Sequence, residues 1–67
     1  MPYSIHTVRF TDHFAVFNQI ALRISAIESV EKFYDQAWGL TIRMHNGDHY
    51  TFLFQNSVDN YFDRLTS

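Results

Sequence analysis

Cysteine is absent from this chain of 67 residues, which also contains only two glycines and one proline. Without cysteine the chain can form no disulfide, and it lacks the best ligands for a structural zinc ion. It has no run of 18 apolar residues, so we expect no membrane-spanning helix. Residues 1–20 have neither the basic start nor the continuous apolar block of a signal peptide. We therefore expect a cytoplasmic protein.

Basic residues are also few. Lys and Arg number five against seven Asp and Glu, which gives a formal net charge of -2. The four arginines, at positions 9, 23, 43 and 64, are scattered along the chain and form no basic run. A chain with this charge has no broad positive field to attract phosphate backbones. We therefore expect neither nucleic acid nor a membrane as the partner.

Large apolar side chains are abundant instead. Aromatic residues make up 18% of the sequence, as much as the charged residues do. We treat residues 1–67 as one domain, and a domain of this size buries only about 60% of the surface of its unfolded chain. Oligomers, disulfides and metals are the usual ways to compensate. We therefore expect a homodimer or an unidentified protein partner, bound through an outer sheet face or an edge strand.

The clearest local signal is Asn46-Gly47, a dipeptide that tolerates positive φ and often joins antiparallel strands. A two-residue loop would mix the apolar residues of the first strand with polar residues of the second. A three-residue loop that begins at His45 instead pairs Ile42 with Tyr50. It gathers seven apolar side chains on one face: Trp38, Leu40, Ile42, Met44, Tyr50, Phe52 and Phe54. Because a one-residue shift moves every side chain to the opposite face, burial favours this second register.

The other face of this hairpin, at residues 38–54, is mixed. It carries Thr41, Arg43, His49, Thr51 and Leu53. Leu53 is the one residue among these with no obvious reason to contact water. We therefore predict that Arg43, His49, Thr51 and Leu53 form an exposed interaction surface.

A short C-terminal helix is predicted at residues 57–65. Asn56 or Ser57 can accept a hydrogen bond from a free amide of its first turn. Its apolar residues follow the spacing i, i+3, i+4 and i+7, and they are Val58, Tyr61, Phe62 and Leu65. An isolated helix of two to three turns is marginal in water. Its apolar stripe must therefore dock, most simply across the aromatic face of the hairpin.

The first half of the chain is less clear. Residues 3–10 favour one strand, and Thr11-Asp12-His13 favours a turn or a helix cap. Residues 14–37 contain no glycine or proline and fit either strands or a helix. As strands, residues 20–24 alternate in polarity, a break follows near Ser25-Ala26, and residues 27–33 are extended. A continuous helix of this length would span about 36 Å, far more than the predicted strands.

A resemblance also favours strands. The order Ile24-Ser25-Ala26-Ile27-Glu28, Leu40-Thr41-Ile42, Asn46-Gly47 and Tyr50-Thr51-Phe52, followed by a short helix, resembles small bacterial β-domains of the flagellar FlbD type and related pleckstrin-homology-like modules. It covers about residues 20–65 and implies that residues 20–33 are extended. No functional residue of those families maps onto this chain. The predicted fold is α+β, with a small antiparallel sheet, the hairpin and the C-terminal helix; the alternative order is β-α-β-β-α, with residues 14–37 helical.

No pattern of residues predicts catalysis, a metal site or a cofactor. His45 and His49 flank a turn, whereas a spacing of four brings histidines together on a helix. Ser57 lacks the strand-turn-helix elbow of a nucleophilic serine and is better placed as a helix cap. The carboxylates of Glu28, Glu31 and Asp35 are expected to lie in solvent. We therefore expect no enzyme.

The sequence thus predicts a small non-enzymatic interaction module that acts as an adaptor, inhibitor or regulator, of bacterial or phage origin. The alternative function is binding of single-stranded nucleic acid. Tyr50, Phe52 and Phe54 alternate along a strand, as stacking aromatics do on sheets that bind such strands. That function requires an open aromatic face. The predicted docking of the helix favours a buried one.

Overall fold

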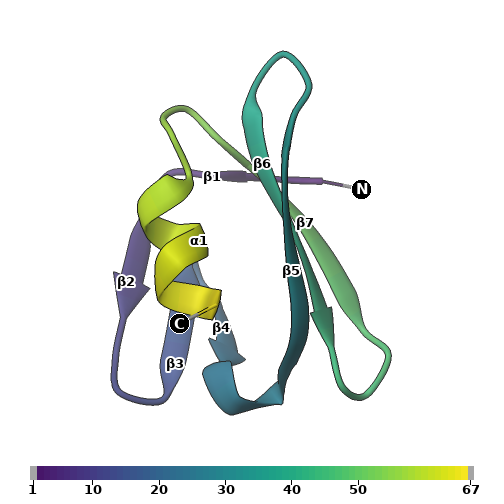
Figure 1. Cartoon of the computed structure of the whole chain (residues 1–67). Coiled ribbons are helices and arrows are strands. Elements are labelled where there is room, and N and C mark those ends of the chain that lie inside the picture. Colours follow the sequence, from purple (N-terminus) through teal and green to yellow (C-terminus); the bar gives the residue numbers. More distant parts are fainter. Residues whose placement is uncertain (1, 67) are drawn as a thin grey trace.

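The computed structural model describes residues 2–66 and contains seven strands in two sheets, mostly antiparallel, with one C-terminal helix (Figure 1). The elements in chain order are β1 (Tyr3–Ile5), β2 (Val8–Phe10), β3 (Phe14–Phe17), β4 (Ile20–Arg23), the 3-10 helix η1 (Ile24–Ala26), β5 (Ile27–Tyr34), β6 (Trp38–Met44), β7 (His49–Phe54) and α1 (Asp59–Thr66). The predicted α+β class is confirmed.

The strands of the described chain are divided between a four-stranded and a three-stranded sheet. One sheet has the order β1-β7-β6-β5 and the other has the order β2-β3-β4. The chain connects the two sheets twice, through residues 6–7 between β1 and β2 and through η1 between β4 and β5. All pairs are antiparallel except β1 with β7, which is parallel. The two sheets therefore enclose one core between them.

The hairpin of β6 and β7 has the predicted register. Ile42 pairs with Tyr50, Leu40 with Phe52, and Trp38 with Phe54. The backbone amide of Met44 donates to the carbonyl of Asp48 over 2.8 Å, which leaves three residues in the loop. Gly47 closes this loop with a φ of 97°, a conformation that favours glycine.

Residues 14–37 are strands, and the helical alternative is wrong. The break predicted near Ser25-Ala26 is the 3-10 helix η1, and the extended segment after it is β5. Two non-glycine residues replace the missing glycines at the turns. Asn18 has a φ of 55° between β3 and β4, and Gln36 has a φ of 64° between β5 and β6. Their positive φ values allow tight turns in a segment without glycine or proline.

The prediction of one strand over residues 3–10 is wrong. The chain bends at His6 and Thr7, so that β1 pairs with β7 in one sheet and β2 with β3 in the other. The side chain of Asn18 holds the bend. Its Oδ1 atom accepts from the amides of His6, at 2.8 Å, and Thr7, at 3.3 Å, and its Nδ2 atom donates to the carbonyl of Ser4 at 2.9 Å. The Thr11-Asp12-His13 segment is a turn, in which the Thr11 hydroxyl accepts from the Phe14 amide over 3.0 Å.

The second sheet covers the aromatic face of the hairpin, a role that the sequence pattern assigned to the helix. The ring of Phe17 stacks on Phe52 with 4.6 Å between ring centroids and meets Phe54 edge-on at 6.1 Å. The buried apolar residues from both sheets and the helix form one cluster: Ile5, Ala15, Phe17, Leu22, Leu40, Ile42, Met44, Phe52, Phe54, Val58 and Leu65. Their exclusion from water is the main stabilising contribution to the fold.

Helix α1 completes the core and begins two residues later than predicted. The Ser57 hydroxyl accepts from the Asp59 amide over 3.3 Å, as a capping side chain does. The predicted stripe faces inward, because Val58 and Leu65 are buried and Tyr61 packs 5.4 Å from Phe54. In Figure 1 the helix lies in front of the gap between β2 and β5. It therefore fills the opening that the two curved sheets leave.

Candidate interaction surface

One face of the four-stranded sheet points away from the core. Because side chains alternate along a strand, the neighbours of buried Leu40, Ile42 and Phe52 project to the opposite side. The second sheet and α1 both pack on the buried side (Figure 1). Within residues 2–66 no element covers the side that points outward. We call this side the outer face, and its residues are Ser4, Ser29, Glu31, Phe33, Gly39, Thr41, Arg43, His49, Thr51 and Leu53.

The first row across the outer face is apolar. Phe33 on β5 pairs with Gly39 on β6, which pairs with Leu53 on β7. The far end of the Phe33 ring occupies the space that a β-carbon on Gly39 would take, so the ring lies over the glycine. Gly39 is buried as a result, while Phe33 and Leu53 are half-buried. This row is the apolar part of the outer face.

The next two rows are polar. Glu31 lies opposite Thr41, which lies opposite Thr51. In the last row Arg43 lies opposite His49, beside the loop of the hairpin. Opposed threonines on neighbouring strands are a favourable cross-strand pair, and their side chains here are half-buried. The face thus passes from apolar at one end to charged at the other.

The four predicted surface residues lie together on this face. Arg43 and His49 are exposed, and Thr51 and Leu53 are half-buried. The sequence pattern missed the contribution of β5, which adds Glu31 and Phe33 to the same surface. Their alternation could not be assigned while residues 14–37 fitted either a helix or strands. A β-bulge between Ile27 and Ser29 further obscures the period of two.

The aromatic strand faces the core. Phe52 is 0% exposed and Phe54 is 6% exposed, while Tyr50 is half-buried beside Tyr3. The binding of single-stranded nucleic acid on β7 needs rings that bases can reach. The two phenylalanine rings on which that alternative function depends are therefore inaccessible in this fold.

The histidines and carboxylates are dispersed. Within the described residues no group of three His, Asp or Glu side chains lies close enough to hold a metal ion. His45 lies 3.9 Å from the carboxylate of Glu28, an exposed contact between the hairpin loop and β5. A hydrogen bond from Lys32 and the positive charge of the same lysine lower the pKa of Asp59. The Lys32 Nζ atom lies 2.8 Å from the Asp59 carboxylate and 5.2 Å from the centre of the Phe62 ring. This contact holds α1 on β5.

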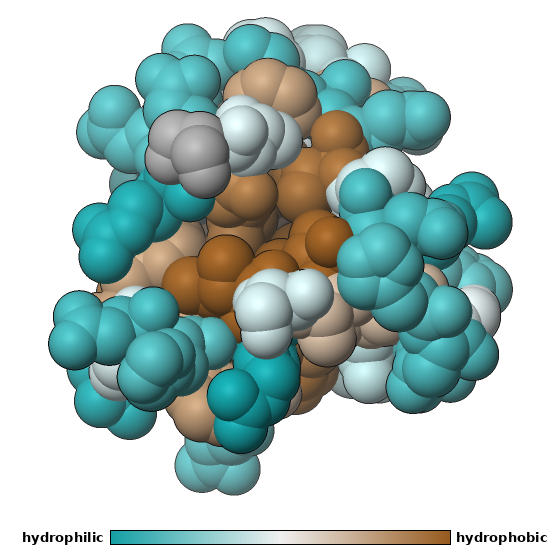
Figure 2. Space-filling view, turned by 60° about the horizontal axis from the view of Figure 1, so that its bottom comes forward, coloured by the Kyte–Doolittle hydropathy of each residue, from teal (hydrophilic) through white to brown (hydrophobic). Residues whose placement is uncertain are grey.

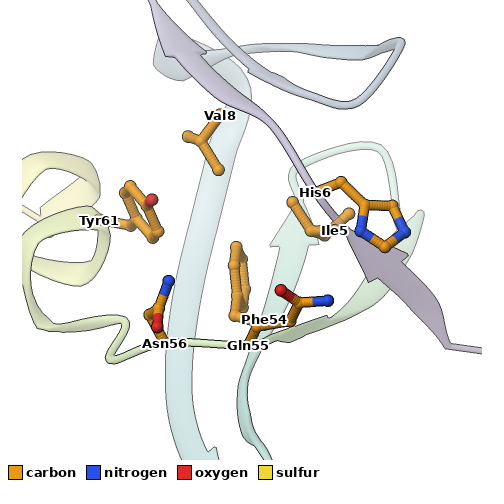
Figure 3. Close-up of a pocket in the computed structure, with 7 residues that line it drawn as sticks. All are labelled: Ile5, His6, Val8, Phe54, Gln55, Asn56 and Tyr61. Atoms are coloured by element: carbon orange, nitrogen blue, oxygen red, sulfur yellow. The ribbon is translucent and has the colours of Figure 1, made fainter.

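A small cavity lies where the β1–β2 bend approaches α1 (Figure 3). Its volume is about 60 Å³, and it is lined by Ile5, His6, Val8, Phe54, Gln55, Asn56 and Tyr61. In Figure 3 the ring of His6 points away from the helix, so it does not enter the space next to Tyr61. Pockets for metabolites commonly measure about 300 to 1,000 Å³. A hollow of about 370 Å³ beside the hairpin loop is bordered by Gly47, Asp48, His49 and Tyr50 and is wide open to solvent.

The core also reaches the surface at the lower end of the molecule. Figure 2 shows an apolar area there, framed by hydrophilic side chains. The elements at this end include η1 and the start of β5, which contribute half-buried Ile24, Ala26 and Ile27. These side chains pack against the buried cluster. The apolar area is therefore the open end of the core.

No protein-family model matches this sequence, and no curated protein or solved structure matches it either. The resemblance to small β-domains of the FlbD type therefore stays a prediction. The described part of the chain contains no helix that is long and apolar enough to cross a membrane.

Proposed function

We propose that this protein is a small non-enzymatic interaction module that self-associates as a homodimer and acts as an adaptor, inhibitor or regulator of a protein partner. The outer face carries the proposal. It is an uncovered face of a four-stranded sheet on which half-buried Phe33 and Leu53 lie beside threonines and an exposed arginine. Aromatic residues and Arg are enriched in protein interfaces, which combine an apolar centre with a polar rim.

The outer side of the three-stranded sheet differs in this respect. Its central row consists of Arg9, Val16 and Ala21. The guanidinium of Arg23 lies 4.9 Å from the centre of the Phe14 ring and covers it. This side is smaller and its one aromatic ring already has a partner. It provides a matched control surface on the same molecule.

A Leu53→Asp substitution tests the proposal. We expect the wild-type protein to show a concentration-dependent dimer by sedimentation velocity and the variant to stay monomeric, because the aspartate would be desolvated in the interface. The fold should persist, with a loss of about 1 kcal/mol of stability from the weaker strand propensity of aspartate. An Ala21→Asp variant, with the same new charge at an exposed position on β4, should dimerise normally. Equal association of all three proteins would exclude the outer face as the interface.

A further inference from the structure

We propose that the occupant of the outer face is a second copy of this chain, placed so that Glu31 of each copy contacts the partner's Arg43. This inference rests on the proposed function and specifies its geometry. Glu31 and Arg43 lie on neighbouring strands in adjacent rows, and both side chains are exposed. Neither forms an ion pair within residues 2–66. The face therefore presents one negative and one positive group, each available to another molecule.

Symmetry limits how two copies can meet. A twofold interface places the same patch on both subunits, so the patch must complement itself. An axis along β6 would set the two Arg43 side chains against each other. An axis across the strands at the row of Glu31 would do the same to the two glutamates. Like charges in direct opposition disfavour both arrangements.

A diagonal axis that passes midway between Glu31 and Arg43, at right angles to the line that joins them, avoids both conflicts. With about 4.8 Å between strands and about 6.6 Å between alternate residues, this axis passes close to Thr41. It sets the Glu31 of each copy opposite the partner's Arg43, so the dimer contains two such contacts. The strands of the two copies then cross at roughly 70°, closer to the orthogonal class of sheet packing than to the aligned class.

The size of the face predicts a weak dimer. The molecule measures 29 × 23 × 22 Å, so its sides have areas of roughly 500 to 670 Å², and we expect about 500 Å² to be buried per copy. A total of about 1,000 Å² is at the lower limit for a specific interface. We therefore expect a micromolar dissociation constant. Its ion pairs join charged groups that are exposed in the single copy, so the dissociation constant should rise with salt concentration.

Charge reversal tests this arrangement. We expect Glu31→Arg alone and Arg43→Glu alone to weaken self-association by about tenfold or more, since each places like charges together twice. An equal mixture of the two variants restores both contacts, because one copy then supplies two positive groups and the other two negative groups. Sedimentation of a fluorescently labelled variant with its unlabelled counterpart should give a heterodimer within about threefold of the wild-type affinity. Arg9→Glu and Asp12→Arg change the net charge equally at exposed sites outside the face and should dimerise like wild type.

The outcomes separate this inference from the proposed function. If Leu53→Asp abolishes the dimer but the charge variants associate like wild type, the outer face is the interface and the pairing of Glu31 with Arg43 is wrong. The pairing is also wrong if the mixture fails to restore association. If the wild-type protein sediments as a monomer up to millimolar concentration, both the dimer and its geometry are excluded. Circular dichroism of each variant confirms that it is folded.

Discussion

The two faces of the four-stranded sheet are built from alternate residues of the same strands, yet they have different partners. Phe52 points inward and stacks on Phe17 of the second sheet. Its neighbour Leu53 points outward, where no element of the described chain covers it. On the inner face five side chains of β6 and β7 are buried, namely Leu40, Ile42, Met44, Phe52 and Phe54, and two, Trp38 and Tyr50, are half-buried. Stability therefore depends on one face and leaves the other available for binding.

This difference shows how a small domain can combine a fixed fold with a variable surface. The register of β6 and β7 is set by the residues that the second sheet covers. Once that register is set, the outer residues can change without moving the strands, since they take little part in the core. Any function of this chain that depends on contact with a partner is expected to use such residues.

The largest effect in this comparison is expected from Phe52→Ala. The ring is fully buried and stacked, so its removal should cost about 3 to 5 kcal/mol of unfolding free energy. That loss would unfold a domain of ordinary stability. Leu53→Ala, one residue further along the same strand, should cost less than about 1 kcal/mol. Urea unfolding of both variants measures the contrast, and equal losses would mean that the two faces are buried alike.

The next effect concerns Asn18, which keeps the two sheets together at the β1–β2 bend. Asn18→Ala removes three hydrogen bonds and places alanine at a φ of 55°. We expect a loss of about 2 kcal/mol from these two causes. Asn18→Gly removes the same hydrogen bonds but tolerates the φ, so it should cost about 1 kcal/mol. Thermal unfolding separates the two; a glycine variant as unstable as the alanine variant would show that the backbone conformation contributes nothing.

The hairpin and its outer face could be predicted because a single turn signal and a dense apolar pattern agree. Asn46-Gly47 limits the loop, and only one register buries the aromatic residues together. The same reasoning placed Leu53 and Arg43 on one exposed surface. The turn signal and the apolar pattern were sufficient to predict the register, because the paired residues of the hairpin are close in sequence.

The second sheet could not be predicted in the same way. Its strands have three or four residues each, too short to show a clear period of two. The bend at His6 and Thr7 depends on Asn18, which is eleven or more residues away, and no glycine or proline indicates it. An asparagine within a segment without glycine was a weak signal of a turn at positive φ. Its bridging role requires the tertiary structure.

The smallest effect is expected at the boundary between the two faces, where Lys32 on the edge strand β5 contacts Asp59 at the start of α1. The hydrogen bond from Lys32 and its positive charge lower the pKa of Asp59 below its ordinary value of 3.8. A carboxylate with a lowered pKa stabilises the fold above the pKa of the unfolded chain and loses this contribution as the pH falls through the folded-state value. Wild type should therefore be slightly more stable than Asp59→Asn near neutral pH, and the difference should disappear in strong acid. Asp63→Asn removes a charge from the same helix but keeps the ion pair of Lys32 with Asp59. The difference in stability between wild type and Asp63→Asn, measured by urea unfolding, should therefore change less with pH. A difference between wild type and Asp59→Asn that stays constant from neutral pH to strong acid would show that Lys32 does not stabilise the ionised carboxylate.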